Sequence, residues 1–299
     1  MNYLSLSDYL KNKYGTKVYK LSLTSGCTCP NRDGTISTGG CIFCSEGGSG
    51  DFAAEYGDLD VQIKEARARV DAKIPAKIPA NERKYIAYFQ SFTNTYGDQA
   101  RLMKLFSKVL EYPEIVGLSI GTRPDCLSTE MIDFLSKLNK KKEVWVELGL
   151  QTIHENTAKM INRGYELPVF EDSYKRLTQA GLKVVVHVIL GLPGESDEDI
   201  LETVKYLADL KPVLFGIKLQ LLHILKGTKL AEMYEKNPFH IYELDEYCNL
   251  VGKCLTLLPK ETVVHRITGD GPKKLLIAPL WSGNKKLVMN TMRNYISNL

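Results

Sequence analysis

The strongest constraint in the sequence is a repeated alternation of short apolar segments with longer segments of helical periodicity. The short segments are rich in β-branched residues and have the length of single buried strands. Strands that alternate with helices form βαβ units and a parallel sheet. The six strands that we expect cover residues 18–23, 85–90, 117–122, 144–150, 184–190 and 216–222.

The helical segments carry their own start and stop signals. Ser128 and Ser196 precede two of them as N-cap residues, and Gly181 follows a third as a C-terminal stop. Six βα units are fewer than the eight of a closed barrel, so we expect an α/β fold with a partial (β/α)6 TIM-like barrel. In such barrels, functional residues lie in the loops after the carboxyl ends of the strands.

The alternation ends near residue 225, which divides the chain of 299 residues into two parts. We expect residues 1–225 to form the barrel and residues 226–299 to form an extension packed on it. The extension contains an expected helix at 242–258 and short strands at 263–267 and 275–277. No apolar run approaches the 18 residues of a membrane span, and the polar amino-terminal segment does not resemble a secretory signal. We therefore expect a cytoplasmic location with no membrane partner.

The net charge of +4 is unevenly distributed. Residues 252–299 hold eight Lys and Arg residues against two Asp and Glu residues, whereas residues 1–251 hold 31 against 33. A basic segment on a neutral body is a possible phosphate-binding surface. The alternative is a solvated face without a partner.

Four of the seven cysteines lie between Cys27 and Cys44, directly after the first expected strand. Cys41 and Cys44 have the spacing of two ligands to one metal centre, and either Cys27 or Cys29 could supply a third thiolate. The other cysteine of this pair could supply a fourth ligand. A zinc ion usually takes four ligands, whereas three thiolates on an iron–sulfur cluster leave one iron open. The spacing leaves both alternatives open.

This segment resembles the cluster motif of the radical S-adenosylmethionine (SAM) superfamily, because it ends in Cys-x-aromatic-Cys with Phe43 as the aromatic residue. Counted from Cys29, its spacing of eleven and two residues resembles that of the Elongator-type branch. The run CPNRDGT, followed by GGC, is similar to bacterial proteins of the YhcC/YtqA type. Four later blocks agree with that family in order, namely FQSFTNTY, GTRPD, ELGLQT and HVILGLPGE.

The resemblance implies two cofactors, a [4Fe–4S] cluster and SAM. It implies Cys29, Cys41 and Cys44 as cluster ligands and leaves Cys27 unassigned. It places Phe43 against adenine, Gln90 and Ser91 at the methionine amino group, and Arg163 as a bidentate partner of the SAM carboxylate. The full set of implied cofactor-binding residues is Phe43, Gln90, Ser91, Glu147, Gln151, Arg163, His187, Gly191 and Gly194.

Three residues near the expected strand ends are candidates for contact with substrate. Glu147 is a carboxylate within an apolar run, and its burial requires a polar ligand or an Arg partner. Lys218 and His223 lie on or just past the sixth expected strand, where they could face the barrel mouth. We assign Glu147, Lys218 and His223 as the candidate catalytic residues.

The resemblance further implies an enzyme that acts on the wobble uridine of tRNA and converts carboxymethylaminomethyl-uridine to aminomethyl-uridine. tRNA would bind through the basic carboxyl-terminal region, and flavodoxin or ferredoxin would supply electrons. Another RNA or a small molecule could be the substrate of the same chemistry. A zinc-stabilised RNA-binding module without radical chemistry is the alternative from a different class.

Overall fold

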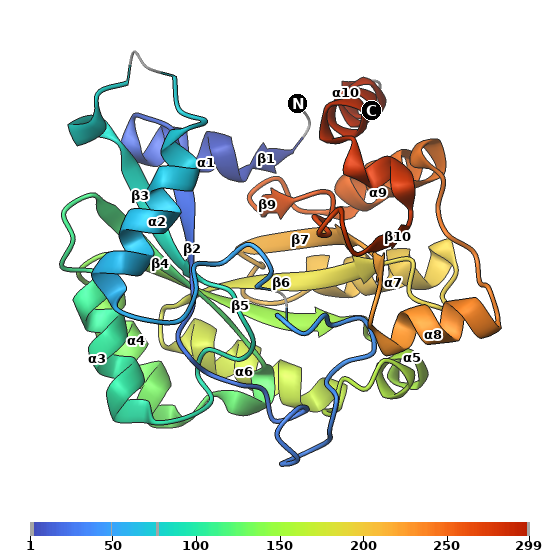
Figure 1. Ribbon diagram of the computed structural model, residues 1–299, viewed down its shortest axis with the longest axis horizontal. Coiled ribbons are helices and arrows are strands. Elements are labelled where there is room, and N and C mark those ends of the chain that lie inside the picture. The colour runs from blue at the N-terminus through green and yellow to red at the C-terminus, as the bar shows by residue number, and fades with distance from the viewer. Residues whose placement is uncertain (1–2, 49, 76–77, 298–299) are drawn as a thin grey trace.

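The computed structural model describes residues 3–48, 50–75 and 78–297 and contains a curled parallel sheet of eight strands (Figure 1). In spatial order these are β1 (Leu4–Ser5), β9 (Val263–Arg266), β7 (Gly216–Leu221), β6 (Lys183–Leu190), β5 (Glu143–Gln151), β4 (Ile115–Thr122), β3 (Lys84–Phe89) and β2 (Val18–Leu23). A separate antiparallel pair joins β8 (Ile224–Leu225) to β10 (Leu276–Ala278).

The helices include the connections between the parallel strands and the elements that follow β7. They are α1 (Leu6–Tyr14), α2 (Leu59–Asp71), α3 (Gln99–Val109), α4 (Thr129–Asn139), α5 (Glu155–Met160), α6 (Leu167–Gln179), α7 (Asp197–Ala208), α8 (Lys229–Lys236), α9 (Leu244–Leu257) and α10 (Lys285–Ser297). Short 3₁₀ turns occupy Ala80–Glu82, Pro124–Cys126 and Leu280–Gly283. Within the described ranges, no helix is long and apolar enough to cross a bilayer.

The expected α/β class and partial barrel are confirmed. The first and last residues of the six expected strands agree with those of β2 to β7 to within two residues. The side chains of Ser128 and Ser196 cap α4 and α7, as expected. The sheet has two more strands than expected, because β9 pairs in parallel with β7 and β1 pairs with β9. The carboxyl-terminal segment therefore contributes a strand to the barrel wall.

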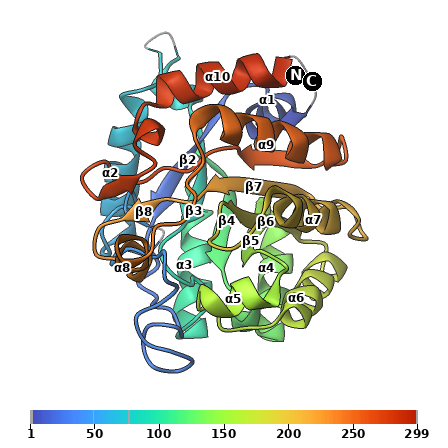
Figure 2. The same cartoon turned by 90° about the vertical axis from the view of Figure 1, so that its right-hand side faces the viewer.

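The hydrophobic core lies between the sheet and the helices that cover its outer side (Figure 2). Leu102 and Phe106 of α3, Leu135 of α4 and Leu177 of α6 are fully buried there. Each such side chain stabilises the fold by about 1.5–3 kcal/mol through removal from water. The helical period of these segments follows directly from that burial, since only one face of each helix meets the sheet.

A buried ion-pair cluster lies at the amino ends of the strands, where α1 covers the barrel. Tyr9 donates a hydrogen bond to Glu143 over 2.6 Å, Lys13 pairs with the same carboxylate at 2.9 Å, and Lys183 contacts it as well. Burial alone would raise the pKa of Glu143, but hydrogen bonds from Lys183, Tyr9 and Lys13 lower it to about 2. This carboxylate therefore ties α1 to β5 and β6.

Replacement of this carboxylate should change how stability depends on pH. Because the pKa of Glu143 falls from 4.5 to about 2 on folding, its contribution is present above pH 4.5 and is lost as the pH falls towards 2. Glu143→Gln should lower the free energy of unfolding by about 3 kcal/mol at pH 6, and the difference should shrink below pH 4.5. Urea unfolding of the iron-free chain between pH 6 and pH 3 measures both quantities. Glu111→Gln, at an exposed position, is the control and should retain the wild-type acid slope.

Candidate active site

Three cysteines from the loop after β2 line one cavity of about 120 Å³ at the carboxyl ends of the strands. They are Cys29, Cys41 and Cys44, and Phe43 lines the same space. The backbone N–H of Cys44 donates to the carbonyl of Cys41 over 3.0 Å, so the second and third cysteines form a tight turn. The sequence prediction that these side chains lie together is consistent with this arrangement.

Cys27 lies elsewhere. Its side chain is buried in the main hydrophobic core, and its Sγ atom lies 3.7 Å from a guanidinium nitrogen of Arg101. Residues 27 and 29 thus face different surroundings, because this segment lies outside β2 and does not have regular extended backbone, in which residues two apart share a face.

The thiol arrangement can be compared with what one zinc ion requires. At a Zn–S distance of 2.3 Å, tetrahedral ligands lie about 3.8 Å apart. Among the described residues, no group of three cysteine sulfurs lies mutually within 4.8 Å. The thiols in this structure are therefore spread more widely than single-ion ligands, and ligands on different irons of a cluster tolerate that spread.

The cavity favours ionised sulfur at Cys41. A hydrogen bond from Cys44 lowers the pKa of Cys41 to about 7 against the effect of burial, and the positive charges of Arg123 and Arg32 act in the same direction. The same hydrogen bond raises the pKa of Cys44 well above its usual value. Since the thiolate is the form that binds metals, one sulfur is already close to its binding form.

Two side chains that the sequence analysis did not assign hold the cysteine loop in place. Asn31 is fully buried and donates to the carbonyls of Asn162 at 2.6 Å and Arg163 at 3.2 Å. Arg32 donates to the carbonyls of Cys44 and Ser45, and its guanidinium lies over the Phe92 ring at 5.4 Å. Both residues belong to the CPNRDGT run. Their position directly after Cys29 was the sequence feature that could have predicted a role in holding this loop.

Backbone strain is concentrated around this cavity. In the described part of the chain, the non-glycine residues with positive φ are Phe92, Gln151 and Asn162, at +59°, +66° and +56°. Phe92 and Gln151 line the thiol cavity, and Asn162 donates from its side chain to the carbonyl of Gly40 beside Cys41. Strained conformations of this kind persist where the surrounding structure requires them, which is often at functional sites.

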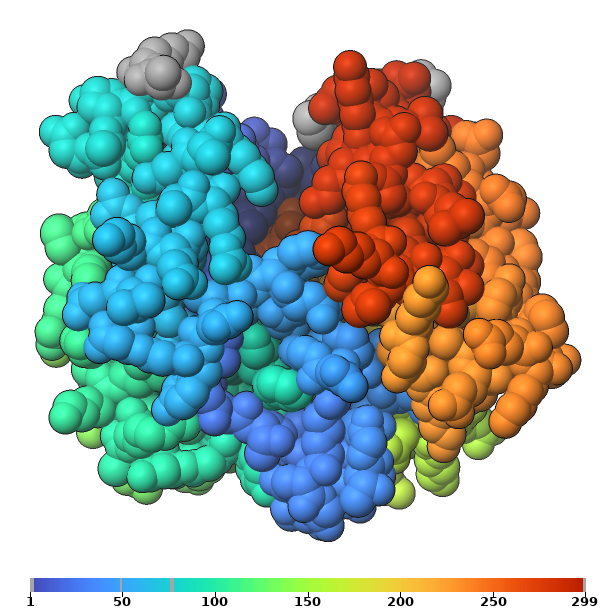
Figure 3. Space-filling model, viewed as in Figure 1, coloured from blue at the N-terminus to red at the C-terminus, as the bar shows by residue number. Residues whose placement is uncertain are grey.

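A second cavity of about 630 Å³ adjoins the first and opens between α2 and the carboxyl-terminal elements. The molecular surface is hollowed there (Figure 3). Phe43, Gln90, Gln151 and His187 line both cavities, so the two spaces are continuous. The larger cavity is strongly cationic, because six cationic side chains against two carboxylates line it, namely Lys20, Arg69, Lys73, Lys218, Arg266 and Lys285 against Asp51 and Asp270.

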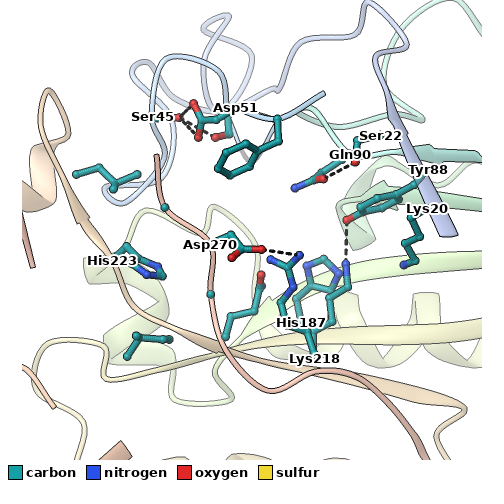
Figure 4. A pocket seen from close by; sticks show the side chains of 18 of the residues that line it. Lys20, Ser22, Ser45, Asp51, Tyr88, Gln90, His187, Lys218, His223 and Asp270 are labelled. Atoms are coloured by element: carbon teal, nitrogen blue, oxygen red, sulfur yellow. Dashed lines mark hydrogen bonds and ion pairs between the residues drawn. The ribbon is translucent and has the colours of Figure 1, made fainter. Parts of the chain in front are cut away.

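The floor of the larger cavity is formed by side chains that contact the buried carboxylate of Glu147, of which Lys20, His187 and Lys218 line the cavity (Figure 4). Glu147 accepts hydrogen bonds from Lys20 at 2.8 Å, Ser119 at 2.5 Å and His187 at 2.7 Å, and Lys218 contacts it directly. Burial alone would raise the pKa of Glu147, but the charges of Lys20 and Lys218 hold it well below its usual value. The expected polar partner of Glu147 is thus a pair of lysines rather than an arginine.

Burial has the opposite effect on the bases in this network. It lowers the pKa of His187 to about 4, with the charge of Lys218 acting in the same direction. Burial also lowers the pKa of Lys218 to about 7, with Lys20 and Arg266 adding to the effect and Glu147 opposing it. The imidazole is therefore neutral near pH 7, and the Lys218 amine can exchange a proton there.

Arg163 differs from its expected role. Its guanidinium donates to the carbonyls of Tyr165, Leu150 and Thr152 and pairs with Glu155 at 3.0 Å. A guanidinium has five N–H donors, so this arrangement leaves too few for a bidentate contact with SAM. Arg163 instead holds the loop after β5 in place.

Arg123 and Asp125 form a bidentate ion pair at 2.9 and 2.7 Å. A third Arg123 nitrogen donates to the Arg163 carbonyl over 2.7 Å. The arginine therefore links the loops after β4 and β5 beside the cysteines.

Three cofactor-binding residues that the resemblance implied, Ser91, Gly191 and Gly194, lie outside both cavities, whereas the candidate catalytic residue His223 lies at the larger one. Ser91 lies 3.2 Å from the Thr24 hydroxyl and does not border either cavity. Gly191 has a φ of +95° and packs under the Tyr242 ring, and Gly194 also lies outside the two linings. His223 lines the larger cavity, but its Nε2 atom lies 3.1 Å from the Ser282 hydroxyl, and Gly269 covers its ring.

A curled parallel α/β sheet with three cysteines in the loop after its first barrel strand defines a cluster-binding barrel enzyme. The chain belongs to the radical SAM superfamily, whose model matches residues 29–207, while the model of the radical SAM C-terminal domain matches residues 215–298. It is 44% identical to the protein YtqA of Bacillus subtilis (strain 168) over 99% of this chain and 90% of that protein. It is 36% identical to Protein YhcC of Escherichia coli (strain K12) over 96% and 90% of the two chains.

A solved structure shares the fold. The archaeal Elp3 of Methanocaldococcus infernus, with an amino-terminal deletion, superposes with a TM-score of 0.65 at 20% identity. The match covers 93% of this chain and 63% of that chain, so this protein spans less than two thirds of the Elp3 length. The expected resemblance to YhcC, YtqA and the Elongator-type branch is therefore confirmed at the level of sequence family and fold.

Family membership also confirms the expected cofactors, since radical SAM proteins bind a [4Fe–4S] cluster and SAM. The observed donor set is compatible with them. Three thiols border one cavity, one of them has a lowered pKa, and the larger cavity continues from it with room for an organic ligand. When bound, the cluster and SAM supply a 5′-deoxyadenosyl radical.

The buried network predicts a large stability effect at Glu147. Glu147→Gln should lower the free energy of unfolding by about 3 kcal/mol, because the buried Lys218 and the partly exposed Lys20 lose their shared counter-charge. Adding Lys218→Met to this variant should recover part of the loss, since one stranded charge is then removed. Urea unfolding of the iron-free single and double variants measures both effects. Equal stability of wild type and Glu147→Gln would show that the network is not the support we describe.

Proposed function

We propose that this radical SAM enzyme modifies tRNA at the wobble uridine and converts carboxymethylaminomethyl-uridine to aminomethyl-uridine. The observation that carries the proposal is the cationic cavity of about 630 Å³ that continues from the thiol cavity. A modified base that ends in a carboxylate, on a polyanionic RNA, suits that charge. The sequence blocks that resemble the YhcC/YtqA type also resemble the wobble-uridine enzyme MnmL, which supports the same substrate.

We assign Cys29, Cys41 and Cys44 as the cluster ligands, since these three line one cavity and Cys27 lies in the core. Phe43, Gln90 and Gln151 border both cavities, which suits contact with SAM between the cluster and the substrate. Arg163 borders the thiol cavity and holds the loop after β5, and Ser91, Gly191 and Gly194 lie outside both cavities, where they would shape the loops that hold SAM.

The residues on the floor of the larger cavity would act on the substrate side. Lys218 and His187 project from neighbouring strands, β7 and β6, and both contact Glu147. His187 also borders the thiol cavity and could reach SAM. His223 supports the wall of the cavity through Ser282.

The chemistry removes a hydrogen atom from the carbon between the amine and the carboxylate of the substrate side chain. Loss of one further electron to the electron-transfer partner and of one proton leaves a C=N bond. One water molecule then hydrolyses this bond to the primary amine on the uridine and the aldehyde glyoxylate. Lys218, whose pKa of about 7 permits proton exchange, stands at the cavity floor to take or return that proton.

The larger cavity opens between two basic walls, which would contact the tRNA backbone. Arg69 of α2 borders it on one side and Lys285 of α10 on the other, and Lys273, Lys274 and Lys286 are exposed nearby in sequence. Reaching the barrel interior requires a flipped base, as in other enzymes that act on single nucleotides. A flavodoxin or ferredoxin as electron donor, and a cytoplasmic location, remain our predictions.

The ligand assignment predicts a difference between neighbouring cysteines. Anaerobically purified protein should contain about four iron atoms per chain and absorb broadly near 400 nm. Cys29→Ala should lose the iron, whereas Cys27→Ala should keep it because Cys27 faces the core. Iron and zinc analysis of both variants measures this. One zinc ion per chain and no iron would support the zinc-stabilised RNA-binding module instead.

The substrate assignment predicts a defined change in tRNA. Reconstituted protein with SAM, a reductant and tRNA that carries carboxymethylaminomethyl-uridine should yield aminomethyl-uridine and 5′-deoxyadenosine, detected by mass spectrometry of nucleosides. Protein without SAM is the control. Formation of 5′-deoxyadenosine while the wobble nucleoside stays unchanged would refute this substrate and favour another RNA or a small molecule.

A further inference from the structure

The floor of the larger cavity carries more positive than negative charge. Lys20 of β2 and Lys218 of β7 share the single carboxylate of Glu147, and His187 is neutral near pH 7. The side chain of Lys218 is 6% exposed and that of Glu147 is fully buried. The Lys20 side chain is 20% exposed, so the nearly buried Lys218 is the amine that lacks a full counter-charge and that a further anion would hold in its charged form.

The hydrogen bonds of these groups show where an anion would bind. Glu147 accepts four hydrogen bonds from described residues, which fills the capacity of a carboxylate. Each lysine has three N–H donors, and in the described part of the chain Lys218 uses two, on Glu147 and on the Tyr88 hydroxyl at 2.9 Å, while Lys20 uses one. The remaining donors belong to side chains that line the larger cavity (Figure 4).

We call this end of the larger cavity, bordered by Lys20, Tyr88 and Lys218, the lysine recess. The charge of Arg266 acts on both lysines from β9, but Arg266 itself pairs with Asp270 at 3.4 Å. Asp270 pairs in turn with Lys285 at 2.6 Å. At the mouth of the cavity, the carboxylate of Asp270 thus offsets the charges of Arg266 and Lys285. In the lysine recess, the two lysines share only the carboxylate of Glu147, which has no further acceptor site.

The depth of the recess selects the kind of anion. Lys218 is the third residue of β7 and lies beside His187 in the sheet, so its side chain rises from within the barrel. A phosphodiester continues into the RNA chain on both sides and cannot enter such a space alone. A carboxylate ends its side chain and can enter it.

We propose that the lysine recess is the receptor for the carboxylate of the substrate side chain, and that Lys218 and Lys20 bind it through their free N–H groups. This inference rests on the proposed function, because it assigns one end of the carboxymethylaminomethyl group to a place in the cavity. The lowered pKa of Lys218 agrees with it, since an anion in the recess would restore the charged form of the amine.

The test compares two RNAs that differ in one charge. Steady-state kinetics of the holoenzyme would use an anticodon stem-loop with carboxymethylaminomethyl-uridine and the same RNA with the carboxylate converted to a carboxamide. The wild type should show kcat/KM roughly 10- to 100-fold higher for the carboxylate RNA, the range expected for hydrogen bonds to a charged group. Lys218→Met should lower both values, because its amine also serves proton transfer, but it should lower the carboxylate value further so that the preference disappears. Lys218→Arg should retain part of the preference.

The matched control is Lys175→Met, which removes an exposed ammonium group of α6 that borders neither cavity. It should keep the wild-type preference. An equal preference in wild type and Lys218→Met would overturn the proposal.

SAM carries a carboxylate too, so a second measurement separates the two sources. The dissociation constant of SAM, measured without RNA, should be the same in wild type and Lys218→Met. If Lys218→Met weakens SAM binding, the recess serves the cofactor and the proposal is wrong. This measurement also reports whether the variant is folded and loaded with its cluster.

A failure of the proposed function can be told from a failure of the recess. If the wild-type holoenzyme acts on neither RNA, the tRNA substrate is refuted, and binding of N-methylglycine is measured by ligand-observed NMR against N-methylglycinamide. Binding of N-methylglycine alone, lost in Lys218→Met, supports a carboxylate receptor for another substrate. Absence of that binding overturns the receptor as well.

Discussion

The buried carboxylate of Glu147 is the interaction on which the interior of this barrel depends. It accepts hydrogen bonds from β2, β4, β6 and β7 while it stands on β5, so one side chain ties five strands together at the level of the cavity floor. A carboxylate in this position is stable only with cationic partners, and two lysines provide them. Two lysines against one carboxylate leave net positive charge at the cavity floor. This charge makes the larger cavity suited to an anionic ligand.

The thiol cavity depends on a different support, in which distant segments hold one loop. Asn31 binds the carbonyls at residues 162 and 163, and Arg32 closes the loop on its own carbonyls at Cys44 and Ser45. Beside this loop, Arg163 and Arg123 donate hydrogen bonds to backbone carbonyls, and Arg123 also donates to a carboxylate. These contacts keep three cysteines at one cavity despite the eleven residues that separate the first two.

The fold could be predicted well because its signals are local. Strand boundaries followed from apolar β-branched runs, and the caps of α4 and α7 followed from Ser128 and Ser196. β1 and α5 were not predicted from the sequence, because a strand of two residues and a helix of six are too short to show a periodic pattern. The parallel addition of β9 to β7 was also missed, because a strand of four residues carries no sign of its partner.

The sequence by itself determined the class of fold, because apolar runs and helix caps are formed by neighbouring residues, and its resemblance to the radical SAM superfamily implied the cofactors and the three cysteines. Only the tertiary structure decided the roles of side chains far apart in the chain. Arg163 could be read as a cofactor ligand until its donors were seen on backbone carbonyls, and Lys20 carried no signal before it met Glu147, 127 residues away. The physical reason is that a buried charge acquires its role from its partners, and strand register alone brings those partners together.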